Sequence, residues 1–449
     1  MIDRPARWVA VAAGGRLVAG DAAAPGPERA VIDSRALRPG DLFVGLRGER
    51  VDGGAFAELA LDAGAWGVVV APEHAERLSA RGAEGGHERG GLAPVIAADD
   101  PLAALGSLAR AWRHELGARV VGVTGSTGKT STKDILAALL RPRLATHASR
   151  ENLNTEIGLP LSVLEASRGV EALVLEMAMR GRDQIGELAA IAEPDVGVIV
   201  NVGPVHLELL GSVERVAAAK AELIRGLAPG AACVVPAGEA LLEAHLRDDL
   251  DTWTFGPGGQ VTLVRQAEGR AEIEARGERV VLELPYAEPY NLLNTLAAVA
   301  AACALGVHPA GRVDVRFSSL RGELVSLRGG VTVVNDCYNA NPMSMRAALE
   351  HLAASPAERR VAVLGTMAEL GERAEALHRE VGRLAAELGV DVLVTVGEGA
   401  LPYVERFDGE THAVRTPEEA GALLEELARP GDRVLVKGSR SVGLERVLA

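Results

Sequence analysis

A glycine-rich turn between a strand-like run and a helical pattern is the segment of this sequence best suited to chemistry. Residues 119–123 form a β-rich run, Gly125 and Gly128 lie in the turn, and Lys129 with Thr130 leads into an amphipathic stretch. Glycines let backbone N–H groups close around an anion, and the helix start adds the positive end of its dipole. In such a loop the lysine neutralises the β- and γ-phosphates and the hydroxyl faces Mg²⁺.

The turn therefore predicts an ATP site, with Lys129 as a catalytic residue. The strict pattern GxxxxGK[ST] is not met, because Val123 stands where the first glycine belongs and Gly122 lies one position early. An ordinary glycine-rich turn before a capped helix is the alternative, and the strand–turn–helix context favours phosphate binding. The loop residues expected around the phosphates are Thr124, Gly125, Ser126, Thr127, Gly128, Lys129, Thr130 and Ser131.

Polar residues at two later strand ends suggest a metal site beside this loop. Glu176 ends the apolar run ALVLE, and His206 follows the run VGVIV. Parallel sheets place their ligands beyond the carboxyl ends of the strands, and Mg²⁺ prefers oxygen ligands. Taken singly, His206 could be a structural histidine and Glu176 a paired acid. Lys220 lies in the helical run VAAAKAELI and, without context, would be a surface lysine.

Composition excludes several classes of protein. The 449 residues are 48% apolar, enough for several cores in two or three domains. A net charge of −14 argues against nucleic-acid binding, which needs a basic face. The three cysteines form no CxxC pair, which predicts neither disulfides nor a zinc cluster and fits a reducing compartment. With no signal-peptide pattern and no apolar run of about 18 residues, we expect a cytoplasmic protein without a membrane span.

Three blocks follow one another along the chain, and we expect domains at 1–98, 99–310 and 311–449. Alternation of strands and helices in the second and third blocks predicts mainly parallel sheets covered on both faces. A polar, glycine-rich segment at 81–91 predicts a surface loop. Short apolar runs at 41–46 and 65–70 alternate with glycine-rich turns in the first block. The expected strands of the second and third blocks are 119–123, 172–177, 196–200, 231–235, 331–334, 361–364, 392–396 and 434–436. The expected helices are 102–116, 132–140 and 213–227, with others starting near Ser344, Glu375 and Pro417.

Several longer segments resemble the Mur ligase superfamily over nearly the whole chain. Its phosphate loop has the form TGxxGKT[ST], which 124–131 matches. The other segments are DSRALRPGDLFVGLRGERVDGGAF, ENLNTEIGLPLSVL, LEMAMRGRDQIGEL, NDCYNANPMSM, GTMAELGE and VLVKGSRSVGLERV. YNANP and KGSR distinguish this member best, and the DNPR of the diaminopimelate-adding relatives is absent.

The resemblance implies an α/β protein of three domains. These are an N-terminal uridine-nucleotide-binding domain, a central P-loop ATPase-like domain with a parallel sheet, and a C-terminal Rossmann-like domain. It implies ATP- and Mg²⁺-dependent ligation through an acyl phosphate, with UDP-N-acetylmuramoyl-tripeptide as carboxylate and D-alanyl-D-alanine as amine. A monomer acting without nucleic acid is expected.

The resemblance also implies roles for individual residues. Metal ligands would be Thr130, Glu176, His206 and Lys220, with Lys220 carbamylated and both Lys220 and His206 counted as catalytic. Adenine and ribose would lie near Asn291, Arg321 and Asp336. Substrate contacts would come from Ser34, Arg35, Asn154, Thr155, Arg180, Asn339, Asn341, Lys437, Ser439 and Arg440.

Three positions depart from the superfamily's usual pattern. Tyr290 stands where histidine is frequent, Thr366 where aspartate is common, and Ala178 where glycine is usual. Alternative functions are another amide ligase of the superfamily, such as folylpolyglutamate synthase or a different muramoyl-peptide ligase, and a P-loop ATPase or kinase that acts as a switch. A catalytically silent relative is disfavoured by the joint presence of Lys129, Thr130, Glu176, His206 and Lys220.

Overall fold

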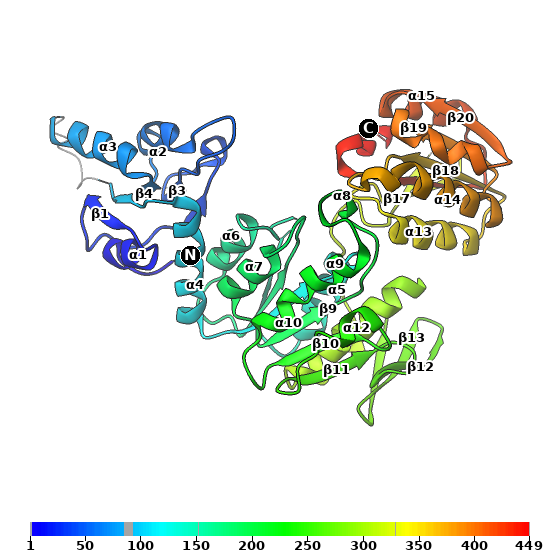
Figure 1. Cartoon of the computed structure of the whole chain (residues 1–449), viewed down its shortest axis with the longest axis horizontal. Helices are drawn as coiled ribbons and strands as arrows, with labels where there is room; N and C mark the ends of the chain where they lie inside the picture. The colour runs from blue at the N-terminus through cyan, green and yellow to red at the C-terminus, as the bar shows by residue number, and fades with distance from the viewer. Residues whose placement is uncertain (1, 85–92, 151, 328, 449) are drawn as a thin grey trace.

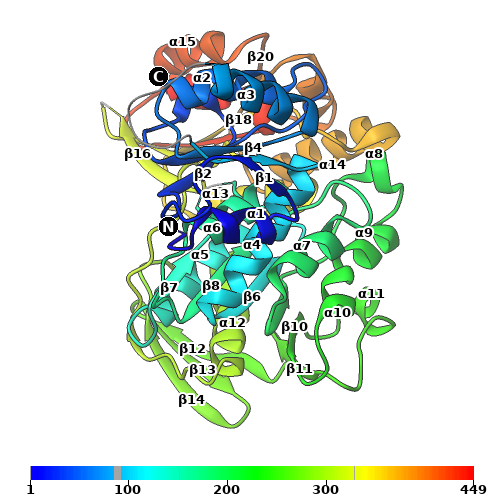
Figure 2. The same ribbon diagram turned by 90° about the vertical axis from the view of Figure 1, so that its left-hand side faces the viewer.

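The computed structural model describes residues 2–84, 93–150, 152–327 and 329–448. Within these residues the chain forms three α/β units, each built on its own sheet. The N-terminal and third units both lie on the same side of the central unit (Figures 1 and 2). The expected three-domain α/β architecture is confirmed. No helix in the described part of the chain is long and apolar enough to cross a membrane.

The N-terminal unit is a five-stranded sheet in the order β1-β5-β4-β3-β2, parallel except for β1. The apolar runs at 41–46 and 65–70 contain β3 and β4, whose residues are all buried. The strands are β1 (Arg16–Ala19), β2 (Arg29–Val31), β3 (Asp41–Val44), β4 (Gly67–Val70) and β5 (Val95–Ala97). The helices are α1 (Ala6–Ala12), α2 (Ala57–Asp62) and α3 (Pro72–Glu84).

The central unit carries a ten-stranded sheet in the order β15-β14-β13-β12-β11-β10-β9-β6-β8-β7. Its parallel part holds β6 (Arg119–Thr124), β7 (Thr146–Ala148), β8 (Ala172–Glu176), β9 (Val196–Ile199), β10 (Ala232–Pro236) and β11 (Asp251–Phe255). Its other part holds β12 (Val261–Ala267), β13 (Arg270–Ala275), β14 (Glu278–Glu283) and β15 (Gly311–Arg312). The helices are α4 (Pro101–Leu116), α5 (Lys129–Leu140), α6 (Gly158–Glu165), α7 (Gln184–Ala192), α8 (Leu207–Leu210), α9 (Val213–Lys220), α10 (Glu222–Gly226), α11 (Ala240–Glu243) and α12 (Pro289–Ala304).

Alternate residues of the central strands enter two different cores. Along β6, Val120 packs with α4 and α7, whereas Val121 and Val123 pack with α5 and α12. Strands buried on both faces in this way are typical of parallel sheets covered by helices on each side. The strand order reverses at β6, since β8 lies on one side of it and β9 on the other. Ligands of open α/β sheets bind at such a switch point.

The third unit has six strands in the order β16-β17-β21-β18-β19-β20, all parallel except β16. All four expected strands are confirmed, as β17, β18, β19 and β21, and so are the three helix starts. The strands are β16 (Glu323–Leu327), β17 (Val331–Asn335), β18 (Arg359–Gly365), β19 (Val392–Val396), β20 (Glu410–Val414) and β21 (Asp432–Lys437). The helices are α13 (Pro342–Ala354), α14 (Ala374–Glu387) and α15 (Pro417–Leu427).

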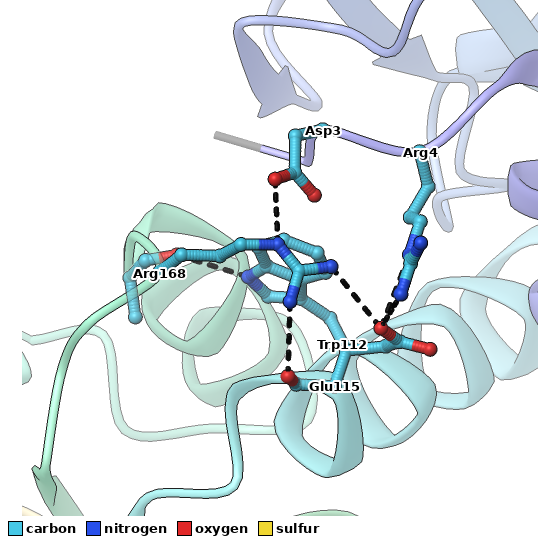
Figure 3. Close-up of polar contacts among 6 residues, drawn as sticks. Asp3, Arg4, Trp112, Glu115 and Arg168 are labelled. Carbon is cyan, nitrogen blue, oxygen red and sulfur yellow. Dashed lines mark hydrogen bonds and ion pairs between the residues drawn. The ribbon is translucent and has the colours of Figure 1, made fainter.

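A cluster of polar contacts ties the N-terminal segment to the central unit (Figure 3). The Arg168 guanidinium contacts the Asp3 carboxylate at 2.5 Å and the Glu115 carboxylate at 3.1 Å. Arg4 donates to the same Glu115 carboxylate, with Nε at 3.1 Å. Beneath them, Trp112 of α4 donates its indole N–H to the Ala166 carbonyl at 2.9 Å. The first residues of the chain are therefore held by α4 and by the loop that follows α6.

The structure differs from the sequence-based expectations in three places. The helix expected over 213–227 is divided into α9 and α10, and Glu222, just after the break, accepts the backbone N–H groups of Asp183 and Gly186 at the start of α7. A surface loop was expected at 81–91. That prediction is wrong for residues 81–84, which continue α3, and the rest of the segment lies outside the described residues. Residues 311 and 312, expected to open the third domain, form β15 at the edge of the central sheet.

Candidate functional site

The glycine-rich turn lies between the end of β6 and the start of α5, at the switch point of the central sheet. Asn201, directly after β9, holds the turn: its side-chain oxygen accepts the Thr127 N–H at 2.9 Å and its backbone oxygen accepts the Ser126 N–H at 3.1 Å. The Ser126 hydroxyl exchanges hydrogen bonds with the backbone of Gly203. Lys129 folds back over the turn and donates to the Gly125 carbonyl at 2.8 Å. The turn is thus a preformed loop held by the neighbouring strand.

Gly128 begins α5 in a left-handed conformation that only glycine adopts without strain. Its φ is 74°, and a Cβ atom at this position would lie 2.4 Å from Oδ1 of Asn294, on α12. The backbone angle therefore requires glycine, and a Cβ at this position would in addition displace the Asn294 amide.

A cavity of about 260 Å³ opens between this loop and the third unit. One wall is the loop, one is the start of α12, and the opposite wall comes from β17, α13 and the end of β21. Expected cofactor residues in the lining are Ser126, Thr127, Gly128, Lys129, Thr130, Ser131, Arg321 and Asp336, and expected substrate residues in it are Asn339, Asn341 and Lys437. Tyr290 from α12 and His351 from α13 meet edge to face at 6.3 Å and also line the cavity.

The segment entering the third unit is fastened to the loop and to α5. Arg321 donates to the Thr130 hydroxyl at 3.2 Å, and its guanidinium stacks 4.0 Å above the Tyr338 ring. Ser318 donates both its N–H and its hydroxyl to Asp134 of α5, each at 3.0 Å. The third unit therefore meets the central unit at the phosphate loop itself.

Basic side chains gather beside the loop although the chain as a whole is acidic. Burial lowers the pKa of Lys129, with Arg321 acting in the same direction and Glu176 opposing both. Burial, with a smaller contribution from Lys129, holds the pKa of Lys220 well below its usual range. Lys220 is 2% exposed, and its amine has no hydrogen-bond or ion-pair partner among the described residues. Burial disfavours the charged form of these amines. A nearby anionic ligand, or an anionic group added to the lysine itself, would compensate for this.

Glu176 offers a free oxygen that suits a divalent cation. The residue is 1% exposed at the end of β8; Asn154 donates to its Oε1 at 2.8 Å, and its Oε2 is buried without a partner. An unpaired buried carboxylate oxygen beside a phosphate loop fits Mg²⁺, which takes one or two carboxylates and completes its shell with phosphates and water. No group of three or more His, Cys, Asp or Glu side chains that could hold a metal ion occurs in the described ranges.

His206 lies apart from the other expected metal ligands. It follows β9 in a left-handed conformation with φ 53°, and its Nδ1 contacts Oε2 of Glu369 in the third unit. Arg180 contacts the other oxygen of Glu369 at 3.4 Å. Among these described residues, no hydrogen bond or ion pair joins His206 to Thr130, Glu176 or Lys220.

Several expected substrate residues of the third unit hold one another. Lys437 is buried and donates to the Asp336 carboxylate at 2.5 Å and to the Asn339 carbonyl at 3.1 Å. Asn341 caps α13 by accepting the Ser344 N–H at 3.0 Å. Ser439 accepts the Ala368 N–H at 2.9 Å and so fixes the turn that carries Glu369.

The same turn is held from behind by His378 of α14. This buried ring accepts the Met367 N–H at its Nε2 and donates from Nδ1 to the Ala374 carbonyl, at 2.9 and 2.6 Å. Burial lowers the pKa of His378, which keeps the ring neutral for this pair of bonds.

The other expected residues lie outside the cavity. Ser34 and Arg35 form a short turn in the N-terminal unit, where the exposed Arg35 pairs with Asp33 at 2.8 Å. Thr155 and Arg180 are exposed, and Arg440 pairs with Glu445 at 2.9 Å. Those nearer the loop but absent from the cavity lining are Thr124, Gly125, Asn154, Glu176, His206, Lys220, Asn291 and Ser439.

The sequence analysis missed three residues that organise the site: Asn201, Asn294 and Glu369. Asn201 ends a strand run, so the rule that ligands follow parallel strands could have found it. Asn294 and Glu369 act through contacts with residues more than 160 positions away. Glu369 lies in GTMAELGE, one of the segments that carry the resemblance, but that segment does not indicate its partner.

A phosphate loop at the switch point of a parallel sheet, facing a second α/β unit across a cavity, defines a nucleotide-dependent enzyme of the P-loop class. Three family models match the chain in order: "Mur ligase family, catalytic domain" over 30–113, "Mur ligase middle domain" over 123–302 and "Mur ligase, glutamate ligase domain" over 320–440. The chain belongs to the Mur ligase family. It is an ATP-dependent ligase that forms a C–N bond.

Relatives match the chain from end to end. The UDP-N-acetylmuramoyl-tripeptide–D-alanyl-D-alanine ligase of Bacillus subtilis is 35% identical, covering 100% of this chain and 98% of that protein. MurF from Acinetobacter baumannii superposes with a TM-score of 0.84 at 28% identity, over 99% of this chain and 97% of that one. MurF ligase from Thermotoga maritima in complex with ADP superposes with a TM-score of 0.78 at 32% identity, over 94% and 96%.

Proposed function

We propose that this protein joins D-alanyl-D-alanine to UDP-N-acetylmuramoyl-tripeptide at the expense of ATP, producing the pentapeptide precursor of peptidoglycan. The observation that carries the proposal is the end-to-end match with relatives of this one name, in all three units. A folate ligase would not need the N-terminal unit, which aligns here as well.

The geometry supports an acyl-phosphate route. A carboxylate is a poor electrophile, so it must first attack the γ-phosphate, a step that depends on positioning and charge neutralisation. Lys129 and Arg321 would neutralise the transferred phosphoryl group, because both reach the loop that would hold it. Docking of the third unit at the loop would keep water from the acyl phosphate until the amine attacks.

Residues of the central unit would hold Mg²⁺ between the protein and the ATP phosphates. Thr130 would provide a hydroxyl and Glu176 its unpaired Oε2. Mg²⁺ bound there would neutralise developing negative charge on the phosphoryl oxygens. Lys220 would contribute as a carbamate, which a buried amine with a lowered pKa favours. His206 would approach as a further ligand.

The N-terminal unit is assigned to the uridine nucleotide and the cavity wall of the third unit to the dipeptide. In that wall Lys437 donates hydrogen bonds to the Asp336 carboxylate and to the Asn339 carbonyl. It would therefore position these two groups as well as the dipeptide. We assign the reaction to the cytoplasm, and the three buried cysteines, all free, support a reducing compartment. A monomer would suffice, because all the assigned groups belong to one chain.

The experiment is ADP release by the purified protein with ATP, Mg²⁺ and UDP-N-acetylmuramoyl-tripeptide, with and without D-alanyl-D-alanine, and with the product identified by mass. Release that depends on the dipeptide and yields the pentapeptide supports the proposal. Release without any amine would favour a switch ATPase or kinase. Turnover with a different amino acid or with a folate would show that the protein is another ligase of the family, with other substrates than those proposed.

A further inference from the structure

We infer that Glu369 of the third unit is a positioning residue for His206, and that it prepares His206 as a ligand only when the third unit is docked. The inference rests on the proposed function, in which His206 approaches the metal. It starts from a contact across the two units: Nδ1 of His206 lies against Oε2 of Glu369. The residues are 163 positions apart in the chain.

The contact fixes which nitrogen of the ring is free. An ionised carboxylate only accepts hydrogen bonds, so Nδ1 of His206 must donate the proton. Nδ1–H in the neutral ring leaves the lone pair on Nε2, which is the arrangement found where a carboxylate orients a histidine toward a metal.

Glu369 is itself held in place from the central unit. Its second oxygen, Oε1, contacts Nε of Arg180 at 3.4 Å, and its backbone carbonyl accepts the Glu208 N–H at 3.2 Å. Both ends of the residue are therefore bound to the segment that carries His206 or to the neighbouring strand end. Side-chain exposures of 22% for His206 and 33% for Glu369 leave the pair partly shielded from water.

The backbone on both sides of the contact adopts an uncommon conformation. His206 has φ 53° and Glu369 has φ 63°, both in the left-handed region that side chains with a Cβ disfavour. Strained residues of this kind concentrate where surrounding contacts impose them at functional sites. Here the contacts around both residues come from two units, so docking of the third unit would hold His206 in this geometry. Docking would thus complete the ligand set as well as exclude water.

The first test compares Glu369→Ala, Glu369→Gln and the matched control Glu372→Ala. Glu372 is an exposed acid three residues further along that forms no ion pair with any described residue, so its loss removes the same charge from the same unit. We expect Glu369→Ala to lower kcat by about 10- to 100-fold, the usual effect of losing a carboxylate that orients a metal-binding histidine. KM for ATP and for the tripeptide nucleotide should stay unchanged, Glu369→Gln should recover part of the loss, and Glu372→Ala should resemble the parent enzyme.

The second test reads the tautomer of His206 without any turnover. Protein containing ¹⁵N-histidine is studied by long-range ¹H–¹⁵N spectra at alkaline pH, where an ordinary histidine ring is neutral. The His206 signal is assigned by its loss in His206→Gln. We expect the Nδ1–H tautomer in the parent protein and the Nε2–H tautomer in Glu369→Ala.

An Nε2–H tautomer in the parent protein, or a kcat in Glu369→Ala equal to that of Glu372→Ala, would overturn the inference. If Glu369→Ala does not fold, Glu369→Gln and the parent spectrum still decide. Failure of the proposed function is distinct, because the parent would then show no dipeptide-dependent ADP release while the tautomer remained measurable.

Discussion

Replacing Gly128 by alanine should weaken nucleotide binding through the phosphate loop while the rest of the protein stays folded. Alanine at φ 74° carries the strain of the left-handed region, about 1–2 kcal/mol. Its Cβ would also lie 2.4 Å from Oδ1 of Asn294, an overlap of the kind that costs about 1–3 kcal/mol in packed interiors. If both penalties fall on the binding conformation, nucleotide affinity should fall between roughly 30-fold and 4000-fold, at 1.4 kcal/mol for each factor of ten.

Gly117 provides the matched control. It ends α4 at φ 62°, and a Cβ there would meet no atom within 4 Å. Gly117→Ala should therefore carry the backbone strain alone, lowering stability by about 1–2 kcal/mol while ADP affinity is unchanged. Adding Asn294→Ala to Gly128→Ala should restore part of the lost affinity by removing the overlapping atom, and Asn294→Ala alone completes the cycle.

Calorimetric titration with ADP and Mg²⁺ measures the dissociation constants, and thermal unfolding checks that each variant is folded. The reasoning is refuted if Gly128→Ala binds ADP as tightly as the parent, because the loop would then tolerate the substituent that the structure excludes. Equal losses of affinity in Gly128→Ala and Gly117→Ala would likewise show that the close approach of α12 has no role.

Three further predictions concern single side chains. Lys129→Ala should reduce ADP release at least about 100-fold through lost phosphate neutralisation, and near-normal turnover would remove the loop from the mechanism. Lys220→Ala should have low activity, and acetate should restore part of that activity if a carbamate acts there. Absence of rescue would leave carbamylation unsupported. Because the folded pKa of His378 lies below its unfolded value of 6.5, the unfolded state binds more protons in acid and stability should fall below that pH, by at most about 1.4 kcal/mol per unit. Urea midpoints measured across this range should be flatter in His378→Gln, and equal slopes would contradict the assignment.

Local patterns were sufficient to predict the parts of the fold that depend on neighbours in sequence. The turn before Lys129 was found because glycine spacing and a following helix are a local signal. Parallel strands such as β6, β8 and β18 were found because strands buried on both faces form continuous apolar runs. The parallel strands β7, β11 and β20 were missed, because their residues are only partly buried and form no such run. The division of the expected helix at Ala221 was missed, since it accompanies the bonds of Glu222 to α7, a contact between segments 36 to 39 residues apart.

The candidate site was predicted in its residue types better than in its contacts. Lys437 and Asp336 were assigned to different ligands, yet they form one ion pair across two parallel strands. Thr130 was expected to face a metal, and in the structure its hydroxyl is held by Arg321, 191 residues further along the chain. Such pairings depend on how three units dock, and no periodicity or spacing within one segment encodes that.

The tie between the first residues and the central unit bears on the order in which this chain matures on the ribosome. The strands of the N-terminal sheet all lie before residue 98, so that sheet can form early in synthesis. Asp3 and Arg4, in contrast, must wait for Glu115 and Arg168 to leave the exit tunnel before they find their partners. The N-terminal unit would thus fold first and be anchored later, with its leading segment loose during the interval.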